Sequence, residues 1–257
     1  MKETFIKEIT KVELNNPVLI EGFPGLGLVG KIATRFLIKQ LKAERFAYLY
    51  SPHFPYVVMV NKKGSVRLYS GKFCFWKDKS GKNDLILFTG DSQAQTIEGQ
   101  YEISDRLLDF AKQYNAKVIV TIGGYRMEAK EKPKVMTAAT NSDLLDRALQ
   151  AGAIVSPMGS PIVGTAGLIL GLSRFKKIDA LCLLGETRGY LPDPKAAQSV
   201  LEVLQKMFKL DVDLGALEEE ITKADKMVTR LQKIEEKRVL QSEEIRKEED
   251  KKTTYIS

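Results

Sequence analysis

The chain has 257 residues, 44% of them hydrophobic and 28% charged, which excludes collagen-like, mucin-like and wholly disordered proteins. A single histidine, His53, excludes any mechanism that needs several imidazoles, which removes most zinc hydrolases and disfavours a serine triad. The net charge is +7, yet residues 216–257 hold 10 basic and 11 acidic residues, so the excess belongs to the part before them, where the basic residues are scattered along the sequence. Without a basic tract interleaved with aromatics, we expect no nucleic-acid partner.

Residues 2–208 alternate β-type runs with helical patterns and glycine-rich turns. A continuous apolar run that ends in glycine predicts a buried central strand at 17–22, and helical spacing follows at 28–41. Alternating aromatic and β-branched residues at 65–78 predict an antiparallel ribbon interrupted at Gly71. Other β-type runs occupy 45–51, 56–61, 84–90, 117–124 and 179–186.

Three further helices complete this region. They are predicted at 98–114, from a cap at Asn141 to Gly152, and from Pro194 through Phe208. Repeated alternation of strand and helix indicates parallel pairing with helices on both faces. We therefore expect an α/β fold, a three-layer α/β/α sandwich with a mostly parallel sheet.

Residues 212–252 differ in composition: they contain no proline, no glycine after Gly215, and a dense mixture of Glu, Lys and Arg. Apolar residues recur at steps of four and three, a short heptad seam formed by Leu217, Ile221, Ala224, Val228 and Leu231. With so few apolar residues, this helix is expected to pack on the body or on a neighbouring subunit. The expected organisation is a core domain at 1–211, a charged helical extension at 212–252 and a C-terminal tail at 253–257.

One glycine motif follows a predicted strand and opens a helix, namely Gly25-x-Gly27-x-x-Gly30. This is the context of a dinucleotide-binding turn. Against that function, Pro24 removes an N–H just before the turn, and the next strand ends at Ser51 without a carboxylate for a ribose. The alternative is a tight strand-to-helix turn that only glycine fits.

Other strands also end in glycine followed by a polar residue, and the carboxyl ends of parallel strands converge on one rim, where ligands bind. Asp91, Glu186 and Arg188 form a candidate polar cluster at this rim, beside the glycine motif. No nucleophile has an adjacent base, so we predict no catalytic residue, no metal site and no cofactor. Gly164, Gly167 and Gly171 would leave one bare helical face for very close helix packing.

The expected location is cytoplasmic. No apolar run is long enough for a membrane helix, and the first 17 residues lack the apolar segment of a secretory signal. Cys74 and Cys182 lie in apolar strand-like runs, as buried free thiols of a reducing compartment do. Abundant Lys and Glu with little His and Cys is typical of thermophiles.

Four segments in fixed order resemble one protein family. They are IEGFPGLGLVG, TIGGY, GTAGLILGL and GETRGYLPDPKAAQSVLEVL, and over 18–208 the chain resembles the archaeal members of the proteasome assembly chaperone family. The resemblance implies an α/β/α domain related to nucleoside phosphorylases and no enzymatic activity. It also implies a homo-oligomer, a tetramer or pentamer, that binds the α-subunits of the proteasome core particle, assists its assembly or opens its gate without ATP.

In that family the contact is a C-terminal motif of an apolar residue, tyrosine and any last residue. The corresponding residues here are Thr254, Tyr255, Ile256 and Ser257, with the tyrosine third from the end instead of second. Two alternatives stay open. The chain could be a nucleotide- or nucleoside-binding enzyme that uses the turn at 22–30, or an oligomeric scaffold that pairs with a different protein.

Overall fold

The structure is a computed structural model, and it describes residues 1–79, 81, 83–127, 132–224 and 226–227. The chain separates into two compact units, Met1–Ala216 and Leu217–Ser257. The predicted tail at 253–257 and the end of the heptad seam lie outside the described residues.

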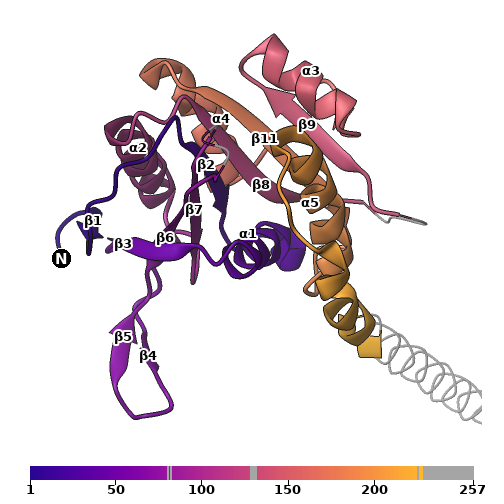
Figure 1. Ribbon diagram of the computed structural model, residues 1–257. Coiled ribbons are helices and arrows are strands. Elements are labelled where there is room, and N and C mark those ends of the chain that lie inside the picture. The colour runs from indigo at the N-terminus through magenta and orange to yellow at the C-terminus, as the bar shows by residue number, and fades with distance from the viewer. Residues whose placement is uncertain (80, 82, 128–131, 225, 228–257) are drawn as a thin grey trace, which may run out of the picture. The chain divides into compact units, whose positions relative to one another are not determined.

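Within the described part of the first unit, a nine-stranded sheet has the order β1-β3-β6-β7-β2-β8-β11-β9-β10 (Figure 1). The strands are β1 Phe5–Glu8, β2 Val18–Gly22, β3 Glu44–Tyr50, β6 Gly71–Trp76, β7 Leu85–Gly90, β8 Val118–Arg126, β9 Val135–Ala139, β10 Ile154–Val155 and β11 Asp179–Thr187. The central strands β7, β2, β8 and β11 are parallel, and β1, β3, β6 and β9 add antiparallel pairs beside them. The predicted α/β fold with a mainly parallel central sheet is confirmed.

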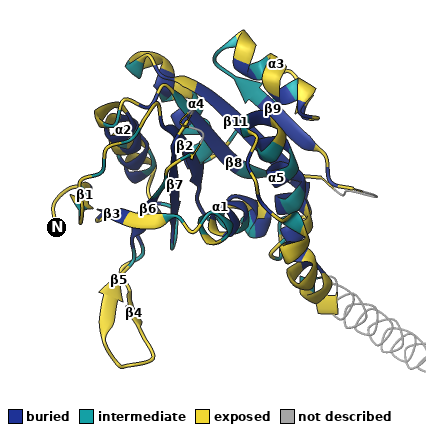
Figure 2. Cartoon of the chain, viewed as in Figure 1, coloured by how far each residue is buried: buried dark blue, intermediate teal, exposed yellow. Residues whose placement is uncertain are grey.

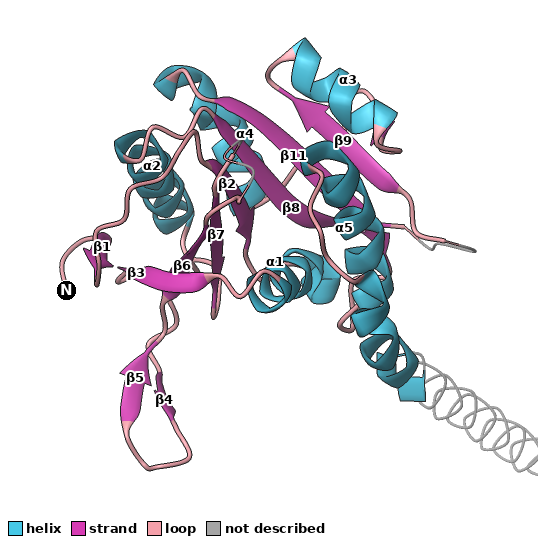
Figure 3. Cartoon of the chain, in the orientation of Figure 1, coloured by secondary structure: helices cyan, strands magenta, loops and turns pink. Residues whose placement is uncertain are grey.

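Helices cover both faces of the sheet (Figure 3). They are α1 Val29–Gln40, α2 Ile97–Gln113, α3 Ser142–Gln150, α4 Thr165–Lys176 and α5 Pro194–Phe208. On one face α1 packs beside α5, on the other α2 packs beside α4, and α3 lies against β9. Short 3₁₀ turns precede α1 at Leu26–Leu28 and follow α5 at Leu214–Leu217.

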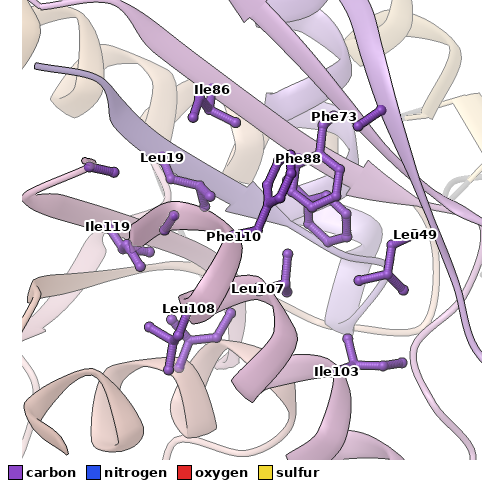
Figure 4. Close-up of a cluster of buried hydrophobic side chains, with 14 of the residues drawn as sticks. Leu19, Leu49, Phe73, Ile86, Phe88, Ile103, Leu107, Leu108, Phe110 and Ile119 are labelled. Atoms are coloured by element: carbon purple, nitrogen blue, oxygen red, sulfur yellow. The ribbon is translucent and has the colours of Figure 1, made fainter. Parts of the chain in front are cut away.

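One core cluster lies between the sheet and α2 (Figure 4). Phe73 of β6 contacts Phe88 of β7 and Phe110 of α2, with ring centroids 4.3 and 4.4 Å apart. Aromatic pairs at such distances stabilise a core beyond the area that they bury. Every second residue of the strands and residues four apart in the helix point into this cluster. The sequence shows these two spacings as its hydrophobic pattern, and that pattern predicted the elements.

Two predictions involve glycines. The segment 65–78 pairs antiparallel and is interrupted before Gly71, as predicted, but its two parts join different sheets: β5 (Val66–Leu68) pairs with β4 (Val58–Val60) in a separate hairpin, whereas β6 enters the main sheet from Gly71. A Cβ at Gly71 would run into the ring of Phe88, so only glycine allows β6 to enter there. In α4, Gly171 faces open space within the described chain, so the expected close helix packing is not formed at that position.

Candidate functional site

The carboxyl ends of the parallel strands meet at one rim, as predicted. Gly22 of β2 is level with Thr89 of β7, and Gly124 and Tyr125 of β8 are level with Gly185 and Glu186 of β11. The rim therefore brings together the glycine turn after β2 and the loop after β11.

The glycine turn uses its own backbone groups. Gly27 has φ of +59°, a conformation that favours glycine. Its N–H donates to the Gly189 carbonyl at 3.3 Å, its carbonyl accepts from the Asp193 N–H at 2.8 Å, and the Leu28 N–H donates to Gly25 at 3.0 Å. A pyrophosphate would need N–H groups of this turn, and two of them already have protein acceptors.

Gly30 serves close packing between α1 and β8. A Cβ at Gly30 would overlap the carbonyl oxygen of Ile122, and one at Gly124 would lie 2.5 Å from the carbonyl oxygen of Leu26. Backbone meets backbone at both places, so the glycines let the turn and helix lie directly on β8. This geometry favours the interpretation of the motif as a tight strand-to-helix turn.

The loop after β11 caps the last helix of the core. Thr187 Oγ1 donates to Asp193 Oδ2 at 2.7 Å and accepts from the Gly189 N–H at 3.1 Å. Asp193 Oδ1 accepts from the Ala196 N–H at 2.9 Å, and α5 begins at Pro194, as proline prefers. Arg188 lies in this loop, so the structure brings it beside the glycine turn.

Asp91 and Glu186 each have partners of their own. Glu186 is buried, and its Oε2 accepts from the Lys134 N–H at 2.9 Å. Asp91 accepts from Arg67 Nη2 at 3.0 Å and from the Ser70 N–H at 3.1 Å. Burial raises the pKa of Asp91, but the hydrogen bonds from Arg67 and Ser70 outweigh burial and hold it below its ordinary value. Structural hydrogen bonds therefore occupy both carboxylates of the predicted polar cluster.

A buried carboxyl that was not predicted from the sequence lies below the rim, that of Glu21 on β2. Its Oε1 accepts from the Phe23 N–H at 2.8 Å, whereas its Oε2 has no hydrogen-bond partner among the described residues. Burial raises its pKa to about 8, so this carboxyl is mainly protonated at neutral pH. Burial also raises the pKa of the nearby Cys182 thiol, to about 12, which leaves that sulfur without thiolate character. A glutamate inside an otherwise apolar run was the signal that could have found this group.

A second feature missed from the sequence is the apolar face of the β4–β5 hairpin, whose two strands are exposed along their length (Figure 2). Val58 pairs with Leu68 and Val60 with Val66, so four aliphatic side chains share one face. Their exposed fractions lie between 50% and 65%, and that of Tyr56 just before them is 99%. A two-stranded hairpin is marginally stable alone, and clustered exposed apolar side chains mark protein contacts.

The described residues form neither a metal cluster nor a membrane-spanning helix. No three His, Cys, Asp or Glu side chains gather there as a metal site would require. No helix in that part of the chain is both long and apolar enough to cross a membrane. The predicted contact residues Thr254, Tyr255, Ile256 and Ser257 lie outside the described residues.

Comparison with known proteins gives consistent matches over nearly the whole chain. Residues 19–232 match the PAC2 family. Protein MJ1210 of Methanocaldococcus jannaschii is 31% identical over 238 residues, which cover 92% of this chain and 91% of that protein. The crystal structure of Pyrococcus furiosus PbaB, an archaeal proteasome activator, matches with 37% identity and a TM-score of 0.86, over 90% of this chain and 100% of that one. P. furiosus PbaA, an archaeal homologue of proteasome-assembly chaperone, matches with 26% identity and a TM-score of 0.73, over 94% and 97%.

Proposed function

Because this chain belongs to the PAC2 family, we propose that it acts on the proteasome as an assembly chaperone or activator and not as an enzyme. The observation that carries the proposal is the match to PbaB, which extends over all of that chain at 37% identity.

The rim supports a role without chemistry. The N–H groups of Gly27 and Leu28 already have acceptors, and the thiol of Cys182 is buried and protonated. Nucleophilic catalysis needs an activated group beside a base, and the described rim residues offer none. A thermal-shift screen against nucleosides, nucleotides and phosphate should therefore leave the melting temperature unchanged, whereas a stabilised chain would favour the enzyme alternative.

The proposed contact is the C-terminal tail, with Tyr255 as its aromatic anchor and Thr254, Ile256 and Ser257 beside it. A single short tail would bind weakly, but several tails on one homo-oligomer can raise the apparent affinity by roughly 10² to 10⁴. The charged segment 212–252 would separate the tails from the core domains. Tails that fit the open gate of the α-ring better than the closed gate would open it without ATP.

The exposed face of the β4–β5 hairpin supports contacts between protein chains, as a homo-oligomer requires. Four aliphatic side chains at least half exposed would lose contact with water on association. The same observation would also suit a scaffold that pairs with a different protein.

The test is co-sedimentation of the full chain and of a chain without Tyr255–Ser257 with an archaeal proteasome core particle. We expect the truncated chain to keep its fold and oligomeric mass and to lose co-sedimentation. Thr253→Ala serves as the matched control and should sediment like the full chain. Equal co-sedimentation of the truncated chain would rule out the tail as the contact, whereas no co-sedimentation of the full chain would refute the proposed partner.

A further inference from the structure

The antiparallel side of the sheet carries a surface that the sequence did not reveal. In antiparallel pairs, directly opposite residues point to the same face. Lys7 of β1 is opposite Tyr48 of β3, which is opposite Lys72 of β6, and Phe5 is opposite Tyr50. We name the surface formed by the side chains of Phe5, Lys7, Arg45, Tyr48, Tyr50 and Lys72 the basic face.

The basic face is the side of these strands turned away from the core. Phe73 and Ala47, which alternate with its residues, belong to the buried cluster beneath α2, so the basic face points the other way. Helix α1 packs on that side against β2, β7 and β8. Lys7, Arg45 and Phe5 are exposed, and Tyr48, Tyr50 and Lys72 are half-buried.

The surrounding charges are strongly unbalanced. Burial is the main cause that lowers the pKa of Lys72. The carboxylate of Asp91 opposes it, and the positive charges of Arg67, Arg45 and Arg35 each lower the pKa further by a smaller amount. The pKa of Lys31 is lowered in the same way, by burial and by Arg35, Lys72 and Arg67, against the opposing effect of Asp91. Basic residues that are spread over positions 7–72 of the sequence thus lie on one surface of the folded chain. Their grouping is therefore not visible in the sequence.

We propose that the basic face binds an acidic surface of a protein partner through that partner's Asp and Glu carboxylates. The chain itself shows the chemistry at the border of this surface. Asp91 accepts from both terminal nitrogens of the Arg67 guanidinium, the two-point geometry that arginine favours with carboxylates. Among the described residues Asp91 pairs with Arg67, which leaves Lys7, Arg45 and Lys72 of the basic face for carboxylates of a partner.

The aromatic side chains favour a protein over a single-stranded nucleic acid. Nucleic-acid bases need free ring faces on which to stack. The Arg45 guanidinium lies over the Tyr48 ring at 4.9 Å, and Tyr50 contacts Tyr48 and Phe5 with ring centroids 5.9 and 5.6 Å apart. Arginine and tyrosine packed in this way are typical of the residues that dominate protein–protein binding. The inference goes beyond the proposed function, because it requires neither the tail nor the α-ring.

The test uses the full chain and a fluorescein-labelled poly-L-glutamate peptide, with binding measured by fluorescence anisotropy at low salt. Reversing two exposed bases of the face, in the Lys7→Glu/Arg45→Glu variant, should weaken binding at least about tenfold. The matched control, Lys195→Glu/Lys206→Glu on α5, makes the same change in net charge and should weaken binding less than about twofold. If the reversal variant does not fold, Lys7→Gln/Arg45→Gln replaces it. This variant removes the two charges without reversing them, so it should weaken binding by about half as much on a logarithmic scale, about threefold.

Three results would overturn the proposal. The first is a wild-type chain that does not bind the peptide, and the second is an equal loss in the α5 control. The third is that a single-stranded oligo-dT with the same charge as the peptide binds more tightly than the peptide, and that Tyr48→Ser weakens this binding. That result would assign the basic face to nucleic acid.

Discussion

Replacement of Glu21 by glutamine should remove a pH dependence of folding that the buried carboxyl creates. Its pKa rises from an ordinary 4.5 to about 8 in the folded chain, so the folded state binds the proton more tightly than the unfolded state. The resulting stabilisation is fully present below about pH 4.5 and is lost as the pH rises through about 8. Between these values, the free energy of unfolding should fall by about 1.4 kcal/mol per pH unit, to a total of about 5 kcal/mol.

The assay is urea unfolding of the wild type and of Glu21→Gln at intervals from pH 5 to pH 9. Glutamine keeps a carbonyl oxygen for the Phe23 N–H, so the variant resembles the protonated chain. The difference in unfolding free energy between the two proteins isolates the contribution of Glu21 from all other titrating groups. Glu44→Gln, at an exposed position of β3, is the control and should keep the wild-type slope. Parallel pH curves for wild type and Glu21→Gln would refute the reasoning.

Two pairs of variants test the roles of local structure, each by urea unfolding. Gly30→Ala should destabilise the chain by about 2–4 kcal/mol because its Cβ would overlap the Ile122 carbonyl. Gly171→Ala should stabilise the chain by about 0.5–1 kcal/mol because that helical position faces open space. Destabilisation of similar size in both variants would contradict the assigned contacts. Asn141→Ala should lower the free energy of unfolding by about 1 kcal/mol, since the Asn141 side chain accepts hydrogen bonds from two N–H groups at the start of α3. Ser142→Ala, at the next position, should change it little. Equal losses in the two variants would show that the stabilisation does not come from the Asn141 cap.

The elements that the sequence predicted well are those with a complete local signal. The apolar run before Gly22 is β2 at the centre of the sheet, and Asn141 caps α3. Pro194 opens α5. Each signal lies within a few residues of the element that it defines, and the hydrophobic period then sets the buried face.

The features that the sequence did not reveal depend on contacts between distant segments. β9 is short, and its pairing with β11 joins residues more than 40 positions apart. The glycine motif has the spacing of a nucleotide site, and only its contact with the Thr187–Asp193 loop shows that backbone acceptors occupy the turn. The basic face draws its residues from three strands, so its charge is invisible until the register of β1, β3 and β6 is known.

The most direct test of the proposed partnership is native mass spectrometry of the full chain mixed with an archaeal proteasome core particle in the absence of nucleotide. The proposed function predicts a complex whose mass equals the core particle plus one or two homo-oligomers, in line with the α-rings at its two ends. A spectrum that shows only the free core particle and the free homo-oligomer, at concentrations where each of them stays assembled, would contradict the proposed function.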